Sequence, residues 1–139
     1  MATNTQFSIA VHMMIGLGLN CERELTSAQM AMSVNTSPSF VRRILAKLSK
    51  ANLVTTTTGK SGFSALAKKA EDISLLEIYK AVGAPQTFAI HDYPAQSFCQ
   101  VSCNIEKVMS KVLDKAQKSF EGTLSETSLA EVIADIKKN

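Results

Sequence analysis

Arg42 and Arg43 stand side by side in a strongly basic part of the chain. An arginine can donate two hydrogen bonds at once to the O6 and N7 atoms of guanine, or to a phosphate group. Between Leu25 and Ala70 the sequence has seven basic residues and no acidic one, although the formal net charge of the whole protein is only +3. Such a block is typical of a surface that binds a polyanion, and the alternative is an ordinary solvated face.

Three cysteines offer a second kind of chemistry. Cys99 and Cys103 are close in sequence, and Cys21 is distant. An iron–sulfur cluster usually takes four protein ligands, mostly thiolates, so the pair would need support from His91, Asp92 or Cys21. The other two alternatives are a partly exposed thiol that senses redox changes, or unreactive cysteines packed in the core. Three cysteines are too few for a disulfide framework, which indicates a reducing compartment.

The elements that carry these residues are predicted to be mainly helical. Thr26 and Gln29 have the spacing of a capping box at a helix start, and the same spacing recurs at Ser74 and Ser128. Ser37 followed by Pro38 predicts another helix start. The predicted helices are 7–19, 26–33, 37–50, 75–82 and 104–120, with a last short helix from residue 128; the predicted strands are 53–58 and 63–66.

Two short helices joined by a tight turn and followed by a β-hairpin predict a winged helix-turn-helix. The major groove of DNA admits one helix, whose first turns reach the bases. The fold class is therefore mainly α with a small β-hairpin wing, and the expected partner is double-stranded DNA. The predicted DNA-binding residues are Thr26, Ser27, Ser37, Ser39, Arg42, Arg43 and Lys47, with Lys60 and Ser61 at the wing tip.

A long C-terminal helix is predicted to join two copies of the chain. Apolar residues recur on it at spacings of four, three and four, as in a coiled-coil seam. A homodimer would place two recognition helices on a palindromic site. The predicted interface residues are Ile105, Met109, Val112 and Ala116, flanked by Val108, Leu113 and Phe120.

Other classes of function are not favoured. Gly59-Lys60-Ser61 resembles part of a P-loop, but Val54 stands where that loop needs glycine, and a strand rather than a helix is predicted to follow. No Ser/His/Asp or paired-carboxylate arrangement is evident, so we expect no enzyme and no resident metal. No run of residues is apolar enough for a membrane span or a secretory signal. We therefore expect a cytoplasmic protein without a cofactor, unless the cysteines hold a cluster.

Several segments resemble the Rrf2 family of bacterial repressors, whose members include an iron–sulfur regulator, a nitric-oxide sensor and a cysteine-metabolism repressor. The resemblance covers nearly the whole chain. It implies a homodimer joined through the long C-terminal helix, with two winged domains on a palindromic operator. The matching segments are 26–31, 39–48, 51–54, 70–82 and 99–105.

The chain departs from the family pattern at two places. The family wing usually has paired glycines before an aromatic residue, whereas Gly62 alone precedes Phe63. Cluster-binding members carry three cysteines before the long helix, whereas this chain has Cys99 and Cys103 there. The alternative functions are a thiol or iron–sulfur sensor acting through a protein partner, or a small thiol redox enzyme. The expected domains are 1–83 for DNA binding, 84–103 as a cysteine-containing sensor segment and 104–139 for dimerisation.

Overall fold

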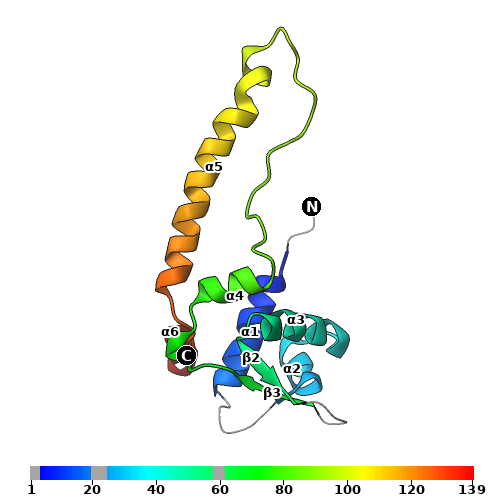
Figure 1. The fold of residues 1–139 in the computed structure, drawn as a ribbon, viewed down its shortest axis with the longest axis vertical. Helices are drawn as coiled ribbons and strands as arrows, with labels where there is room; N and C mark the ends of the chain where they lie inside the picture. Colours follow the sequence, from blue (N-terminus) through cyan, green and yellow to red (C-terminus); the bar gives the residue numbers. More distant parts are fainter. Residues whose placement is uncertain (1–3, 20–24, 58–61) are drawn as a thin grey trace. The chain divides into compact units, whose positions relative to one another are not determined.

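The computed structural model describes residues 4–19, 25–57 and 62–139. The chain forms two compact units. The first, called the winged unit here, comprises residues 1–85 and 124–139. The second, called the α5 unit after its long helix α5 (Gln100–Glu126), comprises residues 86–123. The second unit is therefore an insertion between two parts of the first (Figure 1).

Helix α1 (Gln6–Leu19) is the centre of the winged unit, since it contacts the other four α-helices described in this unit and strand β3 (Phe63–Leu66). Ala10, Met13, Met14 and Leu17 of α1 are buried, which follows from its apolar composition nearly all round. The helices of this unit are α1 (Gln6–Leu19), α2 (Ser27–Val34), α3 (Pro38–Lys50), α4 (Leu75–Ala81) and α6 (Leu129–Lys138), with a short 3₁₀ helix η1 (Ala70–Asp72).

The helix starts in the winged unit confirm the predicted caps. Capping boxes are formed by Thr26 with Gln29 at α2, by Ser74 with Glu77 at α4, and by Ser128 with Glu131 at α6. The turn between α2 and α3 rests on one left-handed residue, Asn35, with a φ of 67°. Asparagine tolerates this conformation better than most residues do. The predicted helix-turn-helix is thus confirmed.

A small antiparallel sheet forms the wing, with the strand order β1-β3-β2. Strands β2 (Val54–Thr56) and β3 (Phe63–Leu66) make the predicted hairpin, and Thr57 extends their pairing at the end next to the loop. The amide of Phe63 donates to Thr57 Oγ1 (3.0 Å), and the amide of Thr57 donates to the Phe63 carbonyl (2.9 Å). Strand β1 (Leu25–Thr26) was not predicted, because two residues leave no alternating pattern.

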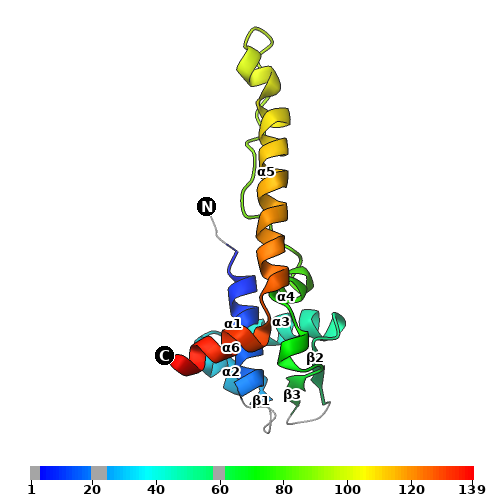
Figure 2. The same ribbon diagram turned by 90° about the vertical axis from the view of Figure 1, so that its left-hand side faces the viewer.

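Helix α6 lies across α1 and belongs to the winged unit (Figure 2). Its start is tied to the start of α4 by two backbone hydrogen bonds, from the Leu75 amide to the Thr127 carbonyl (2.9 Å) and from the Leu129 amide to the Ile73 carbonyl (2.8 Å). The approach to α1 is close, since a Cβ on Gly18 would lie 2.3 Å from Ile133 Cδ1. The sequence-based division placed this last helix with the dimerisation segment, whereas its packing partner is α1.

The α5 unit consists of residues 86–99, which form no helix or strand, and most of helix α5 (Gln100–Glu126). The predicted bounds of this helix, 104–120, were too short at both ends. At its start, Cys99 Sγ accepts a hydrogen bond from the Ser102 amide (3.4 Å), which is the role of a capping side chain. Cysteine is not among the usual capping residues, so the sequence did not reveal this start.

None of the described helices is long and apolar enough to cross a membrane.

Candidate nucleic-acid interface

One face of α3 is buried and the other is open to solvent. Val41, Ile44, Leu45 and Leu48 pack into the core, as their spacing predicts. The helix starts at Ser37, whose Oγ accepts from the Phe40 amide (3.3 Å), with Pro38 in the first turn. The exposed side chains on the opposite face are Ser39, Arg42, Arg43, Ala46, Lys47 and Lys50.

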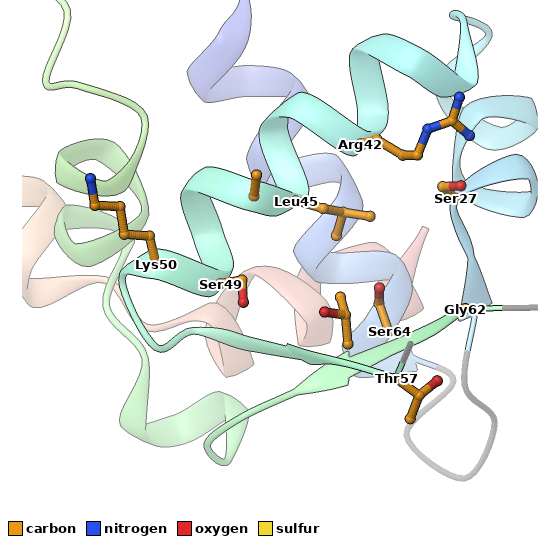
Figure 3. A pocket seen from close by; sticks show the side chains of 10 residues that line it. Ser27, Arg42, Leu45, Ser49, Lys50, Thr57, Gly62 and Ser64 are labelled. Carbon is orange, nitrogen blue, oxygen red and sulfur yellow. The ribbon is translucent and has the colours of Figure 1, made fainter. Parts of the chain in front are cut away.

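A groove of about 700 Å³ separates the open face of α3 from the wing strands. In Figure 3 the guanidinium group of Arg42 points toward Ser27, and Lys50 points away from the groove. Hydroxyl and guanidinium groups are the common donors to the sugar–phosphate backbone. The lining of the groove is rich in such hydroxyl groups, which come from Ser27, Ser49, Thr56, Thr57 and Ser64. The other lining residues are Arg42, Leu45, Ala46, Lys50 and Gly62.

The two adjacent arginines have different surroundings. Arg43 Cζ lies 5.2 Å from the centroid of the Phe40 ring, within the range of a cation–π contact. Arg42 instead lines the groove beside the wing. They are about 100° apart around the helix axis, so their side chains leave the helix in different directions.

Lys47 and Lys68 have partners outside α3. Lys47 Nζ donates to Gln6 Oε1 at 2.7 Å, which ties α3 to the start of α1. Lys68 Nζ forms an ion pair with Glu77 Oε1 at 2.8 Å. Burial alone would raise the pKa of Glu77, but the hydrogen bonds and charge of Lys68 and the hydrogen bonds of Ser74 outweigh it and lower that pKa.

The predicted hydroxyl residues lie where they support the two helix starts. Thr26 Oγ1 accepts from the Gln29 amide (3.2 Å), and the Thr26 amide donates to Gln29 Oε1 (2.9 Å). Ser37 caps α3, and its Oγ lies 3.3 Å from Ser39 Oγ. Contact of these residues with DNA stays a prediction. Lys60 and Ser61, predicted at the wing tip, lie outside the described residues.

Cys99 and Cys103 lie in one turn at the start of α5. Cys99 is half-buried, and Cys103 is exposed with its thiol donating to the Gln96 carbonyl (3.4 Å). His91 is exposed, and its ring centroid lies 5.8 Å from that of Tyr93. Cys21 lies outside the described residues. Among the residues that are described, no three His, Cys, Asp or Glu side chains are grouped so that they could hold a metal ion.

The predicted dimer seam on α5 divides into two rows. Met109, Leu113 and Phe120 are half-buried within the α5 unit, and Leu113 and Phe120 line a small cavity with Phe88. The other row is open: Val112 and Val108, which was predicted to flank the seam, are each 54% exposed. Val101, which was not predicted, is 67% exposed. Of the two remaining members of the predicted seam, Ile105 is half-buried, and Ala116 is exposed and lines the same small cavity as Leu113 and Phe120.

Sequence reasoning missed several residues that shape this surface. Ser49 follows Arg42 by seven positions, so helical periodicity could have placed it on the groove side. The contact of Gln6 with Lys47 and that of Phe40 with Arg43 were not predicted. Contact between residues far apart in sequence, such as Gln6 with Lys47, leaves no periodic trace. The missed groove residues on the wing are Thr56, Thr57 and Ser64.

Comparison with known proteins gives one consistent result. Residues 3–135 match the Rrf2 family, described as iron-dependent transcriptional regulators. The chain is similar to YwnA of Bacillus subtilis (strain 168), named as an HTH-type transcriptional regulator, with 35% identity over 132 residues, covering 94% of this chain and 96% of YwnA.

Two solved structures extend this comparison. A crystal structure described as a DNA binding protein has 30% identity and a TM-score of 0.74, covering 92% of this chain and 98% of that one. T. potens IscR has 23% identity and a TM-score of 0.72, covering 98% of this chain and 88% of that one. The likeness to IscR concerns the fold alone.

Proposed function

Because the chain belongs to the Rrf2 family of transcriptional regulators, we propose that it represses transcription as a homodimer on a palindromic operator. The protein is a DNA-binding transcriptional regulator, and its relatives are named as regulators rather than enzymes. The observation that carries the proposal is the open face of α3, which presents two arginines beside a hydroxyl-lined groove.

The proposed interface has three parts. Arg43 and the first turns of α3 enter the major groove and read base edges. Arg42 and the groove hydroxyls bind the phosphate backbone. Lys60 and Ser61 of the wing tip make further backbone or minor-groove contacts. The basic block supports this interface as a whole, because no acidic residue between Leu25 and Ala70 repels the duplex.

The proposed dimer uses the exposed row of α5. Val101, Val108 and Val112 are apolar and largely open to solvent, which is unusual for three residues on one helix face. Residues 101, 105, 108 and 112 are spaced four, three and four, as in a coiled-coil seam. A symmetric dimer would bury this row on both copies, because each copy covers the row of the other.

A gel shift with duplex DNA from the region upstream of its own gene tests the proposal. We expect a shifted complex whose stoichiometry is two chains per duplex. A matched variant, Arg42→Ala combined with Arg43→Ala, should lose the complex while keeping the circular dichroism spectrum of the wild type, because both side chains are exposed. Equal binding by this variant would refute the assignment of α3 as the recognition helix.

Sensing through thiols is a second candidate function, favoured by the exposed Cys103 and by its position one turn from Cys99. A role as a small thiol redox enzyme would rest on the same pair. The described donors do not make up the four-ligand set of an iron–sulfur cluster. The visible absorption spectrum of anaerobically purified protein tests for a cluster directly, and thiol-dependent turnover of peroxide would favour the enzyme.

A further inference from the structure

Phe40 lies in the first turn of α3 and is held from two sides. Its ring is half-buried and packs against the core of the winged unit. Its amide donates to Ser37 Oγ (3.3 Å), so the helix cap fixes its backbone. The Phe40 ring is therefore held in a fixed position, where it can contact an exposed side chain on the same helix.

The neighbour that uses this support is Arg43. The two residues are three positions apart on the helix, a spacing that places side chains on the same face. Arg43 Cζ lies 5.2 Å from the ring centroid, within the ~6 Å range of cation–π attraction. The Arg43 side chain is exposed, so without this contact its long chain would sample many rotamers.

The chemistry of a guanidinium group makes this contact compatible with DNA binding. The face of a guanidinium group is attracted to the face of an aromatic ring, whereas the N–H donors of the guanidinium lie in the guanidinium plane and stay free of the ring. Those donors can still form a two-bonded contact with the O6 and N7 atoms of guanine. No carboxylate between Leu25 and Ala70 competes for them along this part of the chain.

Base reading depends on such orientation more than phosphate binding does. A two-bonded contact with guanine needs a fixed direction in the groove, whereas a phosphate accepts a cation from many directions. Ordering a long side chain only on binding would reduce affinity. Arg42, which lines the groove next to the wing, has the surroundings of a phosphate contact instead.

We propose that Phe40 is a positioning residue whose ring holds the Arg43 guanidinium in the orientation from which Arg43 reads a guanine. The inference rests on the proposed function and deepens it, because it separates the base-reading arginine from the phosphate-binding one. Phe40 itself touches no base. Its effect on DNA recognition passes entirely through Arg43.

A double-mutant cycle on the full-length protein tests this inference. The probes are a duplex selected by the wild-type protein from a random pool and a mixed-sequence duplex of equal length. Phe40→Leu should weaken binding to the selected duplex by roughly three- to tenfold and change binding to the mixed-sequence duplex little. In an Arg43→Ala background, Phe40→Leu should have no further effect on the selected duplex.

Two controls separate positioning from folding. Phe40→Tyr keeps the ring and should bind DNA like the wild type. In an Arg42→Ala background, Phe40→Leu should still weaken binding to the selected duplex by its full factor. Pentafluorophenylalanine at position 40 keeps the shape of the ring but reverses its charge distribution, so it should act like Phe40→Leu without loss of thermal stability. If Phe40→Leu fails to fold, this fluorinated ring carries the test alone.

Nuclear magnetic resonance gives a readout in the absence of DNA. The Arg43 Nε–H signal should show a ring-current shift that is lost in Phe40→Leu. Equal losses from Phe40→Leu with and without Arg43, or equal losses on both duplexes, would overturn the positioning role and leave the proposed function intact. If the wild-type protein enriches no sequence from the pool, the proposed sequence-specific function falls, and this inference falls with it.

Discussion

Replacing Val112 with aspartate should separate the chain's own fold from its dimerisation. Val112 is 54% exposed, so an aspartate there remains hydrated in the single chain. In the proposed dimer the same side chain would be covered by the second copy. The fold of each protomer should therefore stay intact while the dimer dissociates.

The size of the effect follows from the exposed fraction. Complete burial of a valine side chain stabilises by at least ~1.5 kcal/mol, so covering the exposed half of Val112 contributes about 0.8 kcal/mol per protomer and about 1.6 kcal/mol per dimer. An unpaired aspartate at the contact adds a desolvation penalty of several kcal/mol per charge. A total of about 4 kcal/mol or more would raise the dimer dissociation constant by about 10³-fold.

Sedimentation equilibrium at micromolar concentration measures this change, and circular dichroism melting checks the fold. Lys107→Asp is the matched control, because residue 107 is exposed about 140° around the helix from Val112. The wild type and the control should sediment as dimers, and Val112→Asp as a folded monomer that has lost its operator complex. A monomeric wild type, or a Val112→Asp variant that still dimerises and binds DNA, would show that the exposed row of α5 is not the dimer contact.

Four further outcomes are expected. Affinity for DNA should fall by roughly 10³–10⁵ between about 50 and 200 mM salt if six to ten phosphates are contacted; a flat response in fluorescence anisotropy would contradict the electrostatic argument. Arg42→Ala should weaken selected and mixed-sequence duplexes alike, in the same assay. Gly18→Val should lower the melting temperature, because its Cβ would already lie 2.3 Å from Ile133 Cδ1 and its two methyl groups would add to the overlap; Gly18→Ala should cost less, because the end of the Ile133 side chain can move. Glu77→Gln should reduce the acid sensitivity of unfolding. Because the pKa of Glu77 is lowered on folding, its carboxylate stabilises the fold at pH values above the ordinary pKa of 4.5. This stability is lost as the pH falls through the lowered pKa. The exposed ion pair with Lys68 limits that effect to below ~1 kcal/mol.

The sequence predicted the elements of the winged unit well, because their signals are local. The capping boxes at Thr26, Ser74 and Ser128 and the buried stripe of α3 each depend on residues within one or two helix turns. Strand β1 escaped because its two residues acquire their conformation from pairing with β3. The start of α5 escaped because a cysteine thiol serves as its cap.

The candidate site was predictable in kind but not in detail. Charge and helical spacing indicated Arg42 and Arg43, because both follow from position along one helix. Their different surroundings depend on contacts that spacing does not encode: Arg42 lies beside a groove whose other wall is the wing, and Arg43 lies over Phe40. Tertiary contacts of this kind become visible only when side-chain orientation is known.

The interrupted winged unit also constrains the order in which the protein can fold on the ribosome. Leu129 and Ile133 of α6 are buried in the core that α1 begins, yet they leave the ribosome after the whole α5 unit. A nascent chain that ends before Leu129 therefore has an open core next to Gly18 and lacks the hydrogen bond from the Leu129 amide to Ile73. The core that α1 begins is therefore completed only after the whole α5 unit has been synthesised.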